Sequence, residues 1–120
     1  MPVRSLRSSV MRWPNRRTVH EAVVAWAAHM AGRHAGVVRI GYFGSYARGD
    51  WGVGSDVDLI VVVSDSDLPF EQRPIQWDTL SLPVPADLLV YTQDEWSGMT
   101  GHFRETIDRE AVWVYERNVS

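Results

Sequence analysis

Two aspartates stand two residues apart at the start of an apolar segment. Asp56 and Asp58 precede Leu59–Val63, in which every residue is apolar. Because residues i and i+2 of a strand point to the same face, both carboxylates would lie side by side at the entrance of a buried strand. Two carboxylates this close repel each other unless a cation lies between them. Magnesium takes oxygen ligands, often one or two carboxylates together with phosphate oxygens and water. The pair therefore predicts a magnesium site.

A third aspartate, Asp87, stands in a similar position before another apolar segment, Leu88–Val90. If the two strands are neighbours in the sheet, the carboxylates of Asp56, Asp58 and Asp87 converge on one place. Three acids suit a site for two metal ions, which lie about 3.5–4 Å apart and hold the attacking and leaving oxygens of an in-line displacement. We therefore expect these three aspartates to be the catalytic and metal-binding residues.

Gly44 and Ser45 follow a further predicted strand and are separated from Asp56 by ten residues. A glycine allows the backbone to approach a ligand closely. The N–H groups of Ser45 and Tyr46 would open a short helical turn, and the start of a helix favours an anionic phosphate. Arg48, one turn later, reaches the same anion with its forked guanidinium. We expect Gly44, Ser45 and Arg48 to bind a nucleotide. Each of these features alone is common by chance, but their ordered combination indicates a functional site.

A helix over residues 18–34 is predicted to come before these strands. Apolar residues recur there at i, i+3 and i+4 spacing, which gives one apolar stripe. Thr18 and Glu21 have the spacing of a capping box at its start, and Gly36 supplies the stop.

The remaining elements are predicted from the same kinds of pattern. A second capping box, Thr92 and Glu95, opens a helical region after the third strand, and Gly98 and Gly101 divide it into two pieces. The predicted strands cover residues 37–43, 56–63, 86–91 and 112–115. The fold class is therefore α+β, with helices and strands around one sheet.

Length, charge and missing residue types exclude several classes of protein. The chain has 120 residues, which fits one domain, and it contains neither cysteine nor lysine. Residues 1–17 contain five arginines and no acid, so we divide the chain into a basic arm, 1–17, and a domain, 18–120. The domain contains seven arginines and all 15 acidic residues, a formal charge of −8, which argues against general nucleic-acid binding. No apolar run approaches the roughly 20 residues of a membrane span, and we expect a cytoplasmic protein with no membrane contact.

The combination Gly44-Ser45, ten residues, Asp56-Val57-Asp58 is similar to the GS-X10-DXD signature of the polymerase-beta-type nucleotidyltransferase superfamily. The short length and the ending Phe103–Glu116 resemble its minimal nucleotidyltransferase branch, MNT. The resemblance implies a mixed sheet of order 1-2-3 plus a short C-terminal strand, with helices packed on one face. It also implies transfer of a nucleoside monophosphate, AMP from ATP in the expected case, with two magnesium ions or manganese in their place. Asp87 would then lie near the attacking hydroxyl.

The acceptor and the partner are left open by the residues themselves. Many minimal members stand beside a helical HEPN-type toxin and modify one of its tyrosines, which would make this chain an antitoxin. A transferase that acts on a small molecule with the help of a separate acceptor-binding subunit, and a non-catalytic antitoxin that binds its toxin stoichiometrically, are the alternatives. A second copy of the chain is the other candidate partner.

One argument for a partner comes from strand parity. Ile60 and Val62 share the parity of Asp56 and Asp58, and helices on the opposite face alone would leave them uncovered. A partner would then close over this face near Trp51. That tryptophan stacks on a base, anchors a partner or folds over its own loop.

Overall fold

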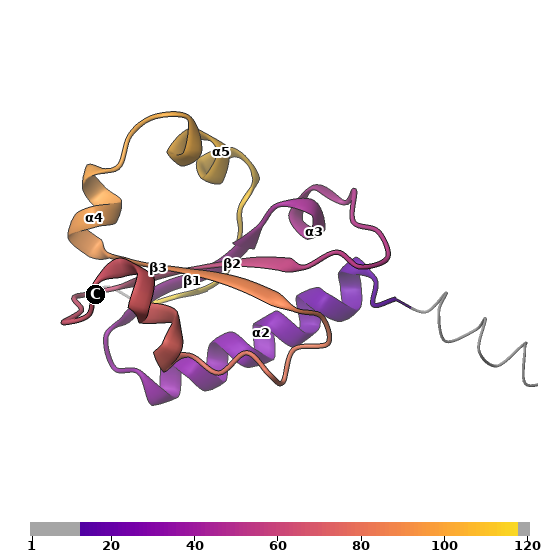
Figure 1. The fold of residues 1–120 in the computed structure, drawn as a ribbon, viewed down its shortest axis with the longest axis horizontal. Coiled ribbons are helices and arrows are strands. Elements are labelled where there is room, and N and C mark those ends of the chain that lie inside the picture. Colours follow the sequence, from indigo (N-terminus) through magenta and orange to yellow (C-terminus); the bar gives the residue numbers. More distant parts are fainter. Residues whose placement is uncertain (1–12, 118–120) are drawn as a thin grey trace, which may run out of the picture.

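The computed structural model describes residues 13–117. The elements along this part of the chain are α2 (Arg16–Arg33), β1 (Val37–Phe43), α3 (Ser45–Arg48), β2 (Val57–Val63), the 3-10 helix η1 (Phe70–Gln76), β3 (Ala86–Thr92), α4 (Gln93–Gly98), α5 (His102–Glu110) and β4 (Val112–Glu116). They form one mixed sheet with helices on both of its faces (Figure 1). No helix in residues 13–117 is both long and apolar enough to cross a lipid bilayer.

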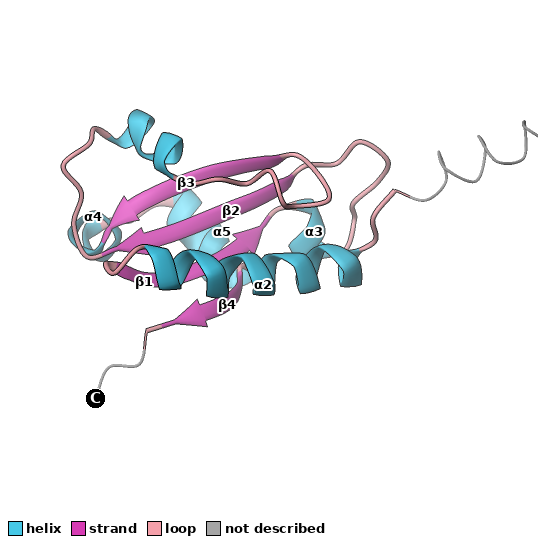
Figure 2. Cartoon of the chain, turned by 90° about the horizontal axis from the view of Figure 1, so that it is seen from below, coloured by secondary structure: helices cyan, strands magenta, loops and turns pink. Residues whose placement is uncertain are grey.

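The four strands lie in the order β3-β2-β1-β4, which confirms the predicted 1-2-3 order and places the short C-terminal strand beside β1. β1 runs antiparallel to both of its neighbours, whereas β2 and β3 are parallel. The parallel pair places the starts of β2 and β3 at the same end of the sheet. β1 and β2 are therefore the central strands of the sheet, and β3 and β4 are its edge strands (Figure 2).

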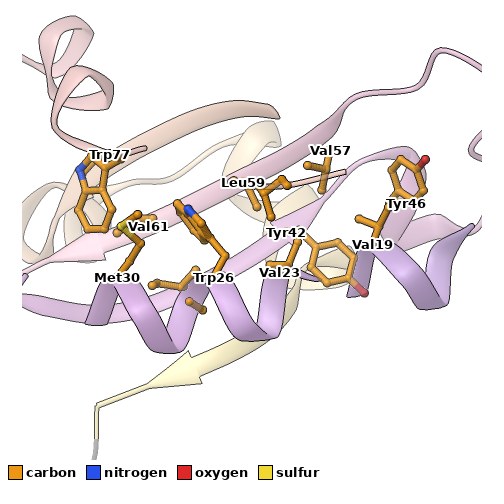
Figure 3. Packing of buried hydrophobic residues seen from close by; sticks show 14 of the residues in the cluster. Val19, Val23, Trp26, Met30, Tyr42, Tyr46, Val57, Leu59, Val61 and Trp77 are labelled. Carbon is orange, nitrogen blue, oxygen red and sulfur yellow. The ribbon is translucent and has the colours of Figure 1, made fainter. Parts of the chain in front are cut away.

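The face of the sheet that α2 covers holds the larger hydrophobic core. α2 contributes Val19, Val23, Trp26 and Met30, and all four are buried. They pack on alternate residues of the strands, among them Leu59 of β2 (Figure 3). Full burial of a side chain of this size stabilises the fold by roughly 1.5–3 kcal/mol, so this layer supplies most of the driving force for folding.

The start of α2 differs from the prediction. The N-cap is Asn15, whose side chain accepts a hydrogen bond from the N–H of Thr18 at 2.9 Å. Asparagine is among the strongest N-cap residues, and its position three residues earlier makes Thr18 the third residue of the helix instead of its cap. The helix also ends at Arg33 with His34 as its C-cap, before Gly36. Arg17 belongs to the first turn of α2, while residues 1–12 of the basic arm lie outside the described residues.

The expectation that helices pack on only one face of the sheet is wrong, because α4 and α5 cover the other face (Figure 1). Ile60 and Val62 are fully buried there against Trp96 of α4 and Ile107 of α5. The sequence signal for this layer was weak, since α5 is polar apart from a narrow stripe. The inference that a partner must cover Ile60 and Val62 is therefore wrong as well.

Both details predicted for the helical region after β3 are confirmed. The Thr92 side chain accepts from the N–H of Glu95 and the Glu95 carboxylate accepts from the N–H of Thr92, which is a complete capping box. Gly101 separates α4 from α5 and has a φ of +100°, a value that favours glycine.

Candidate functional site

The turn between β1 and α3 brings the backbone against one of the predicted aspartates. Gly44 has a φ of +79°, and a Cβ atom on it would lie 2.1 Å from Oδ2 of Asp58. Both the backbone conformation and this close approach therefore require glycine. Gly44 is also the N-cap of α3, so the turn places the start of this short helix beside Asp58.

Asp58 and Asp87 are cross-strand partners at the shared end of the parallel pair β2 and β3. Asp58 is half-buried and Asp87 is exposed. Asp56 is exposed and lies one residue before β2, which begins at Val57 and not at Asp56 as predicted. The N–H of Val57 donates to the carbonyl of Pro85, so β-type pairing starts there. The prediction that the two strands are neighbours is confirmed.

The electrostatics of Asp58 indicate an accumulation of negative charge. Burial raises the pKa of Asp58, and the carboxylates of Asp87 and Asp56 raise it further, against the opposing effect of Arg48. Such an environment stabilises a bound cation, because the cation removes the repulsion between the carboxylates.

The three predicted acids do not form a protein-only metal cage. Within residues 13–117, no group of three or more histidine and acidic side chains is arranged to hold a metal ion. The oxygen chemistry of Asp58 and Asp87 nevertheless fits magnesium, which often takes one or two carboxylates and completes its shell with phosphate oxygens and water. The arrangement suits a metal ion that arrives with a nucleotide.

The predicted phosphate-binding residues are grouped around α3. At the start of this helix the N–H groups of Ser45 and Tyr46 have no intrahelical partner. The Arg48 guanidinium donates through Nε to Asp50 at 3.1 Å and through Nη1 to Glu110 at 3.3 Å. Two of its three nitrogens are therefore held by carboxylates.

Glu110 is a site residue that the sequence reasoning missed. Its Oε2 accepts hydrogen bonds from the N–H of Gly44 at 2.7 Å and from Nη1 of Arg48 at 3.3 Å. Only 13% of its side chain is exposed. The two bonds span 66 and 62 residues of sequence, so no local pattern indicates them. The sequence signal that could have indicated Glu110 is its position at the end of α5, directly before the last strand.

Trp51 folds over its own loop, one of the alternatives stated for it. Its ring stacks on that of Tyr46 with an interplanar angle of 6° and a centroid distance of 5.6 Å. Both belong to the hydrophobic cluster on the α2 side. Trp51 therefore does not extend the face that carries Asp58.

The nucleotidyltransferase domain family matches residues 30–114, a range that includes every site residue described above. The chain belongs to this family. Members of the nucleotidyltransferase domain family generally use divalent metal ions, in agreement with the oxygen-rich carboxylate pair. No curated protein matches the sequence.

Two solved structures share the fold of this nucleotidyltransferase domain. A protein of Sulfolobus solfataricus, provisionally described as a nucleotidyltransferase, aligns with a TM-score of 0.63 and 17% identity over 85% of this chain and 84% of its own. A toxin–antitoxin structure with AMP-PNP aligns with a TM-score of 0.60 and 18% identity over 78% of this chain and 73% of its own.

Proposed function

We propose that the chain transfers AMP from ATP to a tyrosine hydroxyl of a helical HEPN-type protein and acts as its antitoxin. The observation that carries the proposal is the junction of β1, α3 and β2. There Gly44 lies against the Asp58 carboxylate, and Asp87 stands beside Asp58 on the next strand. An anion-binding turn thus adjoins a pair of carboxylates, which is the arrangement that a metal-bound triphosphate needs.

Different residues of the site contact different phosphates of the bound triphosphate. The N–H groups of Ser45 and Tyr46 and the guanidinium of Arg48 bind the β- and γ-phosphates. The carboxylates of Asp56, Asp58 and Asp87 would hold magnesium or manganese beside the α-phosphate. When bound, the metal neutralises charge on the phosphates and on the leaving group.

The reaction is an in-line displacement at the α-phosphorus. The acceptor oxygen forms a bond to phosphorus, the bond from phosphorus to the bridging oxygen breaks, and pyrophosphate leaves. The hydroxyl proton passes to the carboxylate of Asp87, which lies on the side of Asp58 away from β1. Correct alignment of the acceptor supplies much of the rate.

The acceptor part of the proposal has separate support. The likeness to a toxin–antitoxin structure favours a protein acceptor. The described residues include no additional domain that could bind a small acceptor. Ile60 and Val62 do not support a partner, because α4 and α5 already cover them.

The first experiment measures nucleotide binding. ATP and magnesium together should raise the melting temperature more than the sum of their separate effects, because each supplies ligands for the other. An equal shift by ATP in the presence of a chelator would contradict the metal-bridged site.

The second experiment measures transfer. The chain is incubated with ATP labelled at the α-phosphate, magnesium and the product of the neighbouring gene, and label on that protein is located by mass spectrometry. Asp87→Asn should bind ATP and magnesium nearly normally yet transfer no label. Label on a small molecule would support the alternative substrate class. Binding of the partner without any label would support stoichiometric inhibition.

A further inference from the structure

Glu110 lies outside the signature motif, yet it joins the end of α5 to the nucleotide-binding turn. Its Oε2 atom accepts from a backbone N–H of the turn, that of Gly44, and from the side chain of Arg48. One carboxylate oxygen thus contacts two parts of the proposed phosphate site.

We propose that Glu110 is a positioning residue that aligns Arg48 and the Gly44 peptide for the triphosphate. This inference rests on the proposed function, since it concerns the affinity of the same site for a nucleotide. It assigns a role to a residue of α5, the helix that covers the Asp58 face of the sheet.

Glu110 restrains the side chain of Arg48. A free arginine side chain on a surface has many rotamers, and ordering it carries an entropic cost. Arg48 is about half exposed, with 49% of its side chain accessible. Glu110 and Asp50 hold its Nη1 and Nε, so its Nη2 is the nitrogen that remains for a phosphate. Much of the ordering cost is therefore met before the ligand arrives.

Glu110 also contacts the backbone of the turn, at the N–H of Gly44. Gly44 has a positive φ, and its orientation sets the direction of the Ser45 and Tyr46 N–H groups that follow it. The 2.7 Å bond to Glu110 restrains this peptide. Because Glu110 is mostly buried, the bond is better protected from water than the bond between Arg48 and Asp50, whose carboxylate side chain is 62% exposed.

The opposing effect is electrostatic. The negative charge of Glu110 repels a triphosphate that approaches Arg48, and repulsion alone predicts that removal of this charge tightens binding. Positioning requires the oxygen atom, whereas repulsion requires the charge. Glutamine retains an oxygen of the same reach without the charge, and alanine removes both.

The two variants therefore separate the two effects. For ATP with magnesium, measured by titration calorimetry, Glu110→Ala should raise the dissociation constant about fivefold to tenfold. Glu110→Gln should stay within about twofold of wild type, or bind slightly more tightly. Glu105→Ala, which removes an exposed carboxylate of the same helix, is the matched control and should bind as wild type does.

An NMR measurement without nucleotide tests the contact itself. The amide proton of Gly44 should be protected from solvent exchange in wild type and in Glu110→Gln, and should lose protection in Glu110→Ala. A variant that unfolded would lose protection throughout the sheet as well, so the pattern identifies a local effect.

The outcomes are distinct. Equal tightening in both Glu110 variants would overturn the positioning role and assign Glu110 to charge competition. Unchanged ATP binding by Glu110→Ala, with weakened binding by Arg48→Ala, would overturn this inference alone. A wild-type chain that binds no ATP with magnesium would overturn the proposed function and this inference with it.

Discussion

Val61 and Val62 are adjacent and both fully buried, yet their side chains lie in different hydrophobic clusters on opposite faces of the sheet. Val61 belongs to the large cluster under α2, and Val62 belongs to the small cluster under α4 and α5. The α2 side is closed by one helix of 18 residues, whereas the other side is covered by helices of six and nine residues. The site residues Asp58 and Asp87 share the parity of the second side. The larger core thus lies on one face of the sheet and the proposed site residues on the other.

The difference has a physical reason. A carboxylate that must meet metal ions and phosphates cannot lie in a dry core, because burial without a partner is costly. The thin α4–α5 layer leaves Asp58 half-buried and Asp87 exposed at the end of the sheet, while the α2 layer excludes water from the strands. A single sheet can therefore serve as both core and site. The following predictions test this division.

The largest expected effect is on transfer by Asp58→Asn. This variant should lower the rate of transfer of labelled AMP by at least about a hundredfold, because the metal loses a charged ligand. It should not lower the melting temperature in the absence of nucleotide, since removal of the charge also relieves the repulsion from Asp87 and Asp56. A marked loss of stability would show that Asp58 also supports the fold. Asp65→Asn, an exposed change beyond the other end of β2, is the control.

The second prediction compares the two cores through adjacent residues. Leu59→Ala, under α2, should cost about 3–4 kcal/mol of unfolding free energy, and Ile60→Ala, under α5, about 2–3 kcal/mol. Both side chains are fully buried, but the thin layer around Ile60 can collapse more easily into the space left. Urea unfolding of both variants measures the difference. Equal losses would mean that the α4–α5 layer is packed as rigidly as the α2 layer.

These two layers also differ in how well the sequence predicts them. β1, β2 and β3 follow from short apolar runs, and the site motif is a pattern of local spacing, so both can be predicted from the sequence. The cover by α5 was missed because Ile107 is its only fully buried residue. Glu110 was missed because both of its contacts join segments more than 60 residues apart. Local patterns predict elements and motifs, whereas the pairing of distant segments is decided by tertiary packing.

The third prediction concerns the ion pair that fixes η1 to α4. Arg73 is 6% exposed, and both of its terminal nitrogens donate to the carboxylate of Glu95, at 2.6 and 3.1 Å. Glu95→Gln should cost about 1–2 kcal/mol, less than a fully buried pair would, because Glu95 itself is partly exposed. Urea unfolding near neutral pH measures this loss. Gln93→Ala, an exposed change in the same helix, is the control.

The same pair gives a pH dependence with a defined sign. The hydrogen bonds from Arg73, followed by the hydrogen bond from the N–H of Thr92, lower the pKa of Glu95 from 4.5 to about 2. A depressed carboxyl pKa contributes stability that is complete above the unfolded value and is lost as the pH falls toward the folded value. Wild type should therefore lose its advantage over Glu95→Gln between about pH 4.5 and pH 2. An advantage that stayed constant over this range would contradict the assignment.

The smallest expected effect lies at the start of α2 and separates two possible caps. Asn15 accepts from the N–H of Thr18, so Asn15→Ala should cost about 1 kcal/mol of unfolding free energy. Thr18→Ala, at an exposed position inside the first turn, should change the stability by less than about 0.5 kcal/mol. The ratio matters more than either value, because a cap at Thr18 would reverse it. Urea unfolding followed by far-UV circular dichroism measures both variants.

Since α2 lies on the face away from Asp58 and Asp87, transfer by folded Asn15→Ala should equal that of wild type. Reduced transfer by a fully folded variant would mean that the two faces are coupled through α3. Arg16 of α2 contacts α3 through a hydrogen bond to the carbonyl of Ala47.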